Sequence, residues 1–340
     1  KNLIDTRPLY IMPRVNFAYD IKGDGDLIVR GGAGIFYNRP MGNAEYDVIK
    51  FSPYAYSITM DAGSTQNFPG GRMDYNTMGQ ADPFAFVGGI AAHISVNSLN
   101  EYLDFRSGLD LTTDKTPFSG GTGTLPQRPD LAPVALGIAL GGLGITILIG
   151  LYFWLVSGWP IVPLGLLGVL LILTYTTWIT RLPALTLINT GMGFGLLMVT
   201  GTYFVLTRTF SWTALFAALP PFFLGNNLQL LNQFPDVEVD RAAGRRNLPI
   251  LLGRKAGSVL FGFNVLATYV SLVAGVWLGY LPAITLLGLL ILPIGVAAVR
   301  GVRRYADDLP KLVPFMGFNV LLNIVTPILM AVGLFLTAWL

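Results

Sequence analysis

The sequence contains no cysteine and only one histidine among its 340 residues. These absences exclude a disulfide scaffold, a zinc finger, a c-type haem protein and Cys–His catalysis. Charged residues make up only 12% of the chain, whereas hydrophobic residues make up 53%. Together with a mean hydropathy of +0.58, this composition excludes an ordinary soluble enzyme. Lys and Arg do not cluster on a polar face, so the net charge of +3 does not indicate nucleic-acid binding.

The few charges are divided unevenly along the chain. Residues 1–82 carry 17 of the 41 Asp, Glu, Lys and Arg residues, and the following 258 residues carry the other 24. The step near Pro83 is the strongest boundary in the sequence. We therefore expect two segments, 1–82 and 83–340, with different structures.

Long charge-free runs dominate the second segment. Their lengths can be compared with the ~20 apolar residues that cross a bilayer as a helix. Two runs are long enough for two helices each, because Gly and Pro interrupt them at Gly158, Pro160 and Pro163 and at 279–282. We expect an all-α polytopic membrane protein with eight transmembrane helices, in the runs 83–100, 131–180 (two), 182–207, 209–235, 256–299 (two) and 312–340.

The loops between these runs alternate between charged and nearly uncharged. The connections near Gly158, Arg208 and Tyr280 hold one basic residue between them. Because basic residues concentrate in cytoplasmic loops, the other set is predicted to face the cytoplasm: 101–130, Arg181, 236–255 and 300–311.

The first segment has the pattern of a β-hairpin followed by loop. Alternating, aromatic and Gly-rich stretches at 14–20 and 27–37 flank a Gly-Asp turn at 22–26. The segment resembles part of the outer-membrane barrel of TonB-dependent receptors. A few strands cannot close a barrel, so we interpret residues 1–82 as a poorly ordered fragment of a receptor, joined to a different protein.

Two polar clusters lie at predicted cytoplasmic helix ends. Asn100 and Asp104 are four residues apart, and so are Asn232, Asp236 and Asp240 in turn. On a helix this spacing places side chains on one face, about 5–6 Å apart. Adjacent carboxylates repel unless a cation lies between them, and Asn and Asp oxygens suit Mg²⁺, which often also binds substrate phosphates. Simple solvation of helix ends is the alternative, but repetition of the pattern favours a site.

Basic residues lie beside both clusters and suit phosphate oxygens. A diphosphate bound together with Mg²⁺ is therefore the predicted ligand. The predicted phosphate-binding residues are Arg106, Lys115, Arg241, Arg245 and Arg246.

Residues from about 84 onward resemble the UbiA superfamily of intramembrane aromatic prenyltransferases. The resemblance rests on N-E-x-x-D-x-x-S-G-x-D at 100–110, T-P-F-S-G-G-T-G at 116–123 and N-x-x-x-D-x-x-x-D-x-x-x-G-R-R at 232–246. It implies a nine-helix ring in the bacterial inner membrane, with both motifs on the cytoplasmic side. It implies an isoprenyl diphosphate and an aromatic acceptor as substrates, with Asp104, Asp236 and Asp240 as the catalytic carboxylates. The implied Mg²⁺ ligands are Asn100, Asp104, Asp110, Asn232, Asp236 and Asp240.

The sequence departs from the family pattern in ways that bear on function. The match begins at what should be the second helix, so we expect little or no turnover without the first. Asp104 and Asp110 are six residues apart instead of four, which resembles the branch acting on 1,4-dihydroxy-2-naphthoate in menaquinone biosynthesis. Another UbiA-type prenyltransferase with a different acceptor is one alternative. A transporter is another, but it predicts ionisable residues within the spans. His93 is interpreted as a helix-packing residue rather than a cavity-facing proton acceptor.

Overall fold

The computed structural model describes residues 14–20, 28–34, 83–111 and 121–337, and the chain divides into two compact units, Lys1–Ser64 and Thr65–Leu340. In the first unit, strands β1 (Arg14–Asp20) and β2 (Ile28–Gly34) pair antiparallel, with Tyr19 opposite Val29. The expected hairpin is therefore confirmed. Its predicted turn at 22–26 and the rest of residues 35–82 lie outside the described residues.

Every described element of the second unit is helical. Long helices form where the charge-free runs predict them, and short helical turns connect them. The elements are α2 (Pro83–Ser107), η3 (Leu109–Leu111), α3 (Thr124–Gln127), η4 (Pro129–Leu131), α4 (Ala132–Ser157), α5 (Ile161–Thr174), η5 (Ile179–Arg181), α6 (Pro183–Gly191), η6 (Met192–Leu197), α7 (Met198–Thr207), α8 (Trp212–Asn232), α9 (Val237–Ala242), α10 (Leu248–Trp277), η7 (Ala283–Ile291), α11 (Leu292–Tyr305) and α12 (Leu309–Thr337).

The predicted helix breaks are largely confirmed. Helix α4 ends before Gly158 and α10 ends before Gly279, and both glycines have positive φ. Pro163 does not interrupt a helix, because it lies in the first turn of α5, where a missing N–H breaks no hydrogen bond.

Six helices are long and apolar enough to cross a membrane: 129–157, Pro183–Thr207, Trp212–Asn232, Leu248–Trp277, Ala283–Tyr305 and Leu309–Thr337. Within the described ranges, α5 is apolar but only 14 residues long, and α2 is a 25-residue helix that carries several polar side chains. Six of the eight expected spans are therefore confirmed by length and composition, and the chain is a polytopic membrane protein.

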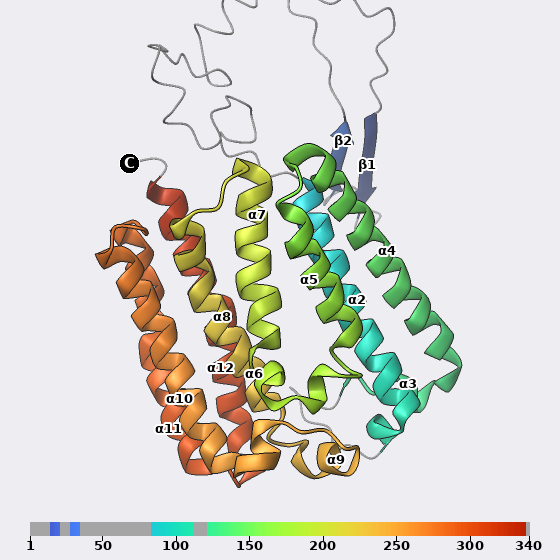
Figure 1. Ribbon diagram of the computed structural model, residues 1–340, viewed down its shortest axis with the longest axis vertical. Helices are drawn as coiled ribbons and strands as arrows, with labels where there is room; N and C mark the ends of the chain where they lie inside the picture. The colour runs from blue at the N-terminus through green and yellow to red at the C-terminus, as the bar shows by residue number, and fades with distance from the viewer. Residues whose placement is uncertain (1–13, 21–27, 35–82, 112–120, 338–340) are drawn as a thin grey trace, which may run out of the picture. The chain divides into compact units, whose positions relative to one another are not determined.

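Within the second unit, α2, α4 and α5 lie on one side, α10, α11 and α12 on the other, and α6, α7 and α8 between them (Figure 1). Helix α8 packs against α6, α10 and α12. The largest core cluster joins α8 to α10, α11 and α12 and includes Leu224, Phe261 and Leu322. Outward-facing side chains such as Leu155 and Trp277 are 83% exposed, which suits a surface in contact with lipid.

Candidate functional site

A cavity of about 540 Å³ lies within the helical unit, between α2, α5, α6, η6 and α8. All six predicted metal ligands line it: Asn100, Asp104, Asp110, Asn232, Asp236 and Asp240. The fold therefore brings the two sequence motifs, more than a hundred residues apart, to one cavity.

The first motif occupies the end of α2 and the turn that follows. Asn100 donates a hydrogen bond from Nδ2 to Oδ2 of Asp104 at 2.9 Å and another to Thr176 Oγ1 at 3.1 Å, as expected for side chains four residues apart on one helical face. Asp110 lies in η3, where it is buried. The short turn between α2 and η3 thus allows an aspartate six residues away to reach the same cavity.

The end of the 116–123 motif, at Gly121 and Thr122, approaches these carboxylates. Thr122 donates hydrogen bonds to the Glu101 carboxylate, at 2.6 Å from Oγ1 and 3.1 Å from its backbone N. A Cβ at Gly121, whose φ is +67°, would lie 3.3 Å from Glu101 Oε2 and 3.5 Å from Asp110 Oδ1. A glycine is required here because the backbone itself lies against two carboxylates.

The second motif spans the end of α8, a turn and α9. Asn232 is the last residue of α8, Asp236 follows in the turn, and Asp240 lies on α9. The amide of Asn247 donates to Asp240 Oδ2 at 3.0 Å, and its Oδ1 accepts from the Ile250 N–H at 3.0 Å, which caps α10. Asn247 therefore holds both the Asp240 carboxylate and the first turn of α10 in position.

Arg245 joins the two motifs. Its Nη2 donates to Oδ1 of Asp104, and its Nη1 donates to Oδ1 of Asp240 at 3.0 Å. The Arg245 side chain is 17% exposed, and those of Asp104 and Asp240 are 10% and 5% exposed in this ion triad. One guanidinium is thus shared between a carboxylate from each motif.

Asp236 lies outside this ion triad. Burial, followed by repulsion from the Asp240 carboxylate, raises the pKa of Asp236 to about 7. Within the described chain, its Oδ1 is buried and has no hydrogen-bond partner. Burial also raises the pKa of Asp240, against the opposing effect of Arg245. At this end of the cavity, the nearby hydrogen-bond donors of the described chain therefore do not satisfy all of the carboxylate oxygens.

These residues fit a hard divalent cation. Among the residues the structure describes, no group of three or more Asp, Glu or His side chains is already arranged around a metal position. The buried, unpaired oxygen of Asp236 and the amide oxygens of Asn100 and Asn232 nevertheless supply the donor types that Mg²⁺ prefers. In this structure, the cation that lies between the Asp104 and Asp240 carboxylates is the guanidinium of Arg245.

The other predicted phosphate-binding residues lie elsewhere. Arg106, Arg241 and Arg246 are exposed and do not line the cavity. Arg241 pairs with Glu238 at 2.7 Å on the surface. Lys115 lies outside the described residues. Of the five, Arg245 is the residue that the described structure places in the cavity, and the roles of the other four stay predictions.

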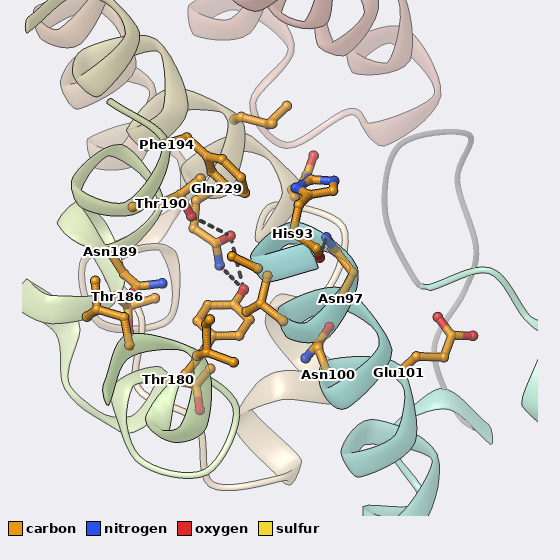
Figure 2. Close-up of a pocket in the computed structure, with 18 of the residues that line it drawn as sticks. His93, Asn97, Asn100, Glu101, Thr180, Thr186, Asn189, Thr190, Phe194 and Gln229 are labelled. Carbon is orange, nitrogen blue, oxygen red and sulfur yellow. Dashed lines mark hydrogen bonds between the residues drawn. The ribbon is translucent and has the colours of Figure 1, made fainter. Parts of the chain in front are cut away.

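Sequence reasoning missed the uncharged polar wall of the cavity. Thr190 donates to Gln229 Oε1 at 3.3 Å, and Gln229 Nε2 donates to the Tyr175 hydroxyl at 2.8 Å (Figure 2). Asn189 lines the same wall. The available indication was the presence of amides inside otherwise apolar runs, because such side chains turn away from lipid. His93 also lines the cavity, edge-on to Phe194 with ring centroids 5.1 Å apart, so its interpretation as a packing residue was incomplete.

Comparison with known families supports both resemblances. The profile of the UbiA prenyltransferase family matches residues 78–322, and a profile described as an outer membrane beta barrel domain matches residues 1–113. The apo structure of a UbiA homolog from Aeropyrum pernix K1 has a TM-score of 0.54 and 17% sequence identity, over 75% of this chain and 96% of that chain. The helical unit therefore has a UbiA-like fold.

Three curated proteins are similar in sequence. 1,4-Dihydroxy-2-naphthoate octaprenyltransferase of Bacillus subtilis is 31% identical over 61% of this chain. 2-Carboxy-1,4-naphthoquinone phytyltransferase of Synechocystis is 30% identical over 53%, and digeranylgeranylglyceryl phosphate synthase of Pyrococcus furiosus is 25% identical over 55%. The chain spans 66%, 59% and 64% of the lengths of these relatives, which is less than two thirds of each.

Proposed function

The chain belongs to the UbiA prenyltransferase family, and from that premise we propose that it transfers a polyprenyl group from an isoprenyl diphosphate to an aromatic acceptor. The observation that carries the proposal is the convergence of both Asn/Asp motifs on one cavity, with Arg245 between them. A diphosphate needs cationic partners, and a polyprenyl chain needs an apolar path. The cavity offers the first through Arg245, and its apolar lining, which includes Val96, Ile172 and Leu197, suits the second.

The charges of the site suggest how its residues act. Arg245 presents a planar set of N–H donors that matches phosphate oxygens. Asn100, Asp104, Asp110, Asn232, Asp236 and Asp240 would hold Mg²⁺, which when bound supplies neutralising charge for a diphosphate leaving group. The allylic C–O bond breaks with its electron pair leaving on the diphosphate. A ring carbon of the acceptor then bonds to the allylic carbon, and the ring recovers aromaticity by releasing H⁺, or CO₂ where the attacked carbon carries a carboxylate, with the bonding electron pair left in the ring.

The acceptor we propose is 1,4-dihydroxy-2-naphthoate. Two similar proteins are named for naphthoate or naphthoquinone substrates, and the spacing of Asp104 and Asp110 supports the same branch. The similarity to digeranylgeranylglyceryl phosphate synthase makes a glycerol-phosphate lipid the principal alternative. Because little turnover is expected without the first helix, the test compares binding: the naphthoate but not geranylgeranylglyceryl phosphate is expected to bind, and the opposite preference would refute the aromatic acceptor.

We further propose that α2 and α5 complete a set of eight spans and that the cavity opens towards the cytoplasm of a bacterial inner membrane. The alternation of charged and uncharged loops supports this orientation. Residues 1–82 are proposed to be a receptor-like fragment without a part in the reaction. Cysteine labelling of Ala243 against Gly279 in intact cells would test the topology, with only the second expected to react from outside.

Binding of a non-hydrolysable diphosphate tests the function independently of turnover. The full chain, purified in nanodiscs, is titrated with farnesyl thiodiphosphate with and without Mg²⁺. We expect Mg²⁺-dependent binding that Asp236→Ala weakens by on the order of tenfold or more. Glu238→Ala is the matched control, because Glu238 lies two residues away but is exposed and paired with Arg241. Binding that is independent of both Mg²⁺ and Asp236 would refute the proposal.

A further inference from the structure

The polar wall of the cavity is built on closely packed helices. A Cβ on Gly191 or Gly195 would lie 2.1 Å from the backbone O or 2.4 Å from the backbone N of Phe222, so α6 and η6 lie directly against α8. Asn226 Oδ1 accepts from the Gly191 N–H at 2.9 Å across the same contact. The helix between α6 and α7 widens into a π-helix at η6, a local change that is frequent at functional sites. The wall is therefore held in a fixed position.

Asn189 provides an unused acceptor on this wall. Its Oδ1 is buried and has no hydrogen-bond partner among the described residues, although the residue lines the cavity. Its neighbours Thr190 and Gln229 already bond to each other and to Tyr175. An amide oxygen buried without a donor is unfavourable, so this position suits a ligand that donates a hydrogen bond.

Aromatic side chains border the cavity on two sides: one comes from η6, beside the polar wall, and the other comes from α2. His93 on α2 and Phe194 on η6 meet edge to face, and Asn97 holds the backbone of that turn through a 2.8 Å bond to the His93 carbonyl. Figure 2 shows Asn189 and Gln229 facing the same space as His93 and Phe194. A Cβ at Gly193, Gly165 or Gly168, all lining residues, would meet nothing within 4 Å, so the cavity is open at these three positions.

We propose that Asn189, Gln229, His93 and Phe194 form the acceptor subsite, which binds a hydroxylated aromatic ring whose O–H donates to Asn189 Oδ1. This inference deepens the proposed function and rests on it. A ring held there lies in the same cavity as the Asp residues and Arg245, and its hydroxyl is recognised by amides instead of by charge. The amide of Gln229 is already engaged with Thr190 and Tyr175.

The test measures binding of 1-hydroxy-2-naphthoate, a fluorescent and redox-stable probe, to the full chain in nanodiscs. Asn189→Ala is expected to raise its Kd by about fivefold or more. Asn319→Ala is the matched control, because Asn319 on α12 also has a buried Oδ1 without a partner in the described chain but does not line the cavity. It should leave the Kd unchanged.

A change in the ligand guards against misfolding of the variant. 1-Methoxy-2-naphthoate lacks the O–H donor, so it should bind the unmodified chain about as weakly as the hydroxyl probe binds Asn189→Ala, and the variant should no longer distinguish the two. Equal affinity of both probes for the unmodified chain, or an unchanged Kd in Asn189→Ala, would overturn the subsite. Mg²⁺-dependent binding of farnesyl thiodiphosphate is measured in parallel. Its persistence would leave the proposed function standing when the subsite fails, and its absence would refute the proposed function itself.

Discussion

Removing the charge of Arg245 should lower the stability of the metal-free protein. It should also increase the stabilisation of the protein by Mg²⁺. Arg245→Met keeps an unbranched apolar stem but leaves Asp104 and Asp240 without their shared counter-ion. Breaking a buried ion pair costs about 3–5 kcal/mol. Because the three side chains retain 5–17% exposure and the carboxylates can take up protons, we expect the lower end, about 3 kcal/mol at pH 8.

Thermal unfolding in EDTA and in increasing Mg²⁺ measures this effect. A loss of about 3 kcal/mol corresponds to a Tm lower by about 6–12 °C in a domain of this size. Since Mg²⁺ no longer has to displace a guanidinium, its stabilising effect should begin at lower concentration than in the unmodified chain. Farnesyl thiodiphosphate should nevertheless bind more weakly, because a phosphate partner has been removed.

Two further variants separate this explanation from general damage. Arg241→Met removes an exposed pair with Glu238 and should change stability by less than about 0.5 kcal/mol. Asp104→Asn combined with Arg245→Met removes one of the two uncompensated charges and should recover part of the lost Tm. An Arg245→Met chain with the original Tm in EDTA and an unchanged Mg²⁺ response would refute the role of Arg245 as the shared counter-ion.

Three other predictions follow from the same geometry. The pKa of Asp236 in the folded chain, about 7, lies above its unfolded value. Protonation of Asp236 therefore favours the folded state at acid pH, and that contribution is lost as pH rises through about 7. Mg²⁺ affinity, measured by Mn²⁺ competition, should increase from pH 6 to 8, and Asp236→Asn should flatten this dependence. Asn247→Ala removes both the bond to Asp240 and the cap of α10, and should lower stability by about 1–2 kcal/mol, whereas Asn247→Ser should keep part of the cap; equal Tm values for the two variants would contradict this. Gly195→Ala places a Cβ 2.4 Å from Phe222 N and should cost about 1–3 kcal/mol in detergent unfolding, whereas Gly137→Ala, which meets nothing within 4 Å, should not; similar losses in both would refute the close packing of η6 on α8.

The parts of this protein that depend on local pattern could be predicted from its sequence. Charge-free runs and their Gly and Pro breaks place the helices, and four-residue spacing places Asn100 beside Asp104. The number of spans was harder to predict because α2 carries polar residues that line the cavity, and because α5 is short. Length and hydropathy are poor indicators of a transmembrane helix when that helix also lines a polar site.

Long-range pairing could not be predicted from spacing. Arg245 was expected to bind phosphate together with Arg241 and Arg246, and neither composition nor neighbours distinguish these three arginines. Only the fold shows that Arg245 alone of them lines the cavity. The polar wall was missed for a related reason: Asn189 and Gln229 are single amides in apolar runs, and they line one cavity because α6 packs against α8.

The ion triad also sets an order on biosynthesis. Asp104 and Arg245 are separated by 141 residues, which a ribosome adds in roughly 7–28 s at ~5–20 residues per second. Throughout that interval Asp104 has been synthesised while its cationic partner has not. Until then, of the side chains that bond to Asp104 here, Asn100 is present on the same helix. The helical unit can adopt its final arrangement only after the loop following α9 has been translated, and a chain that ends before Arg245 would leave Asp104 without its arginine partner.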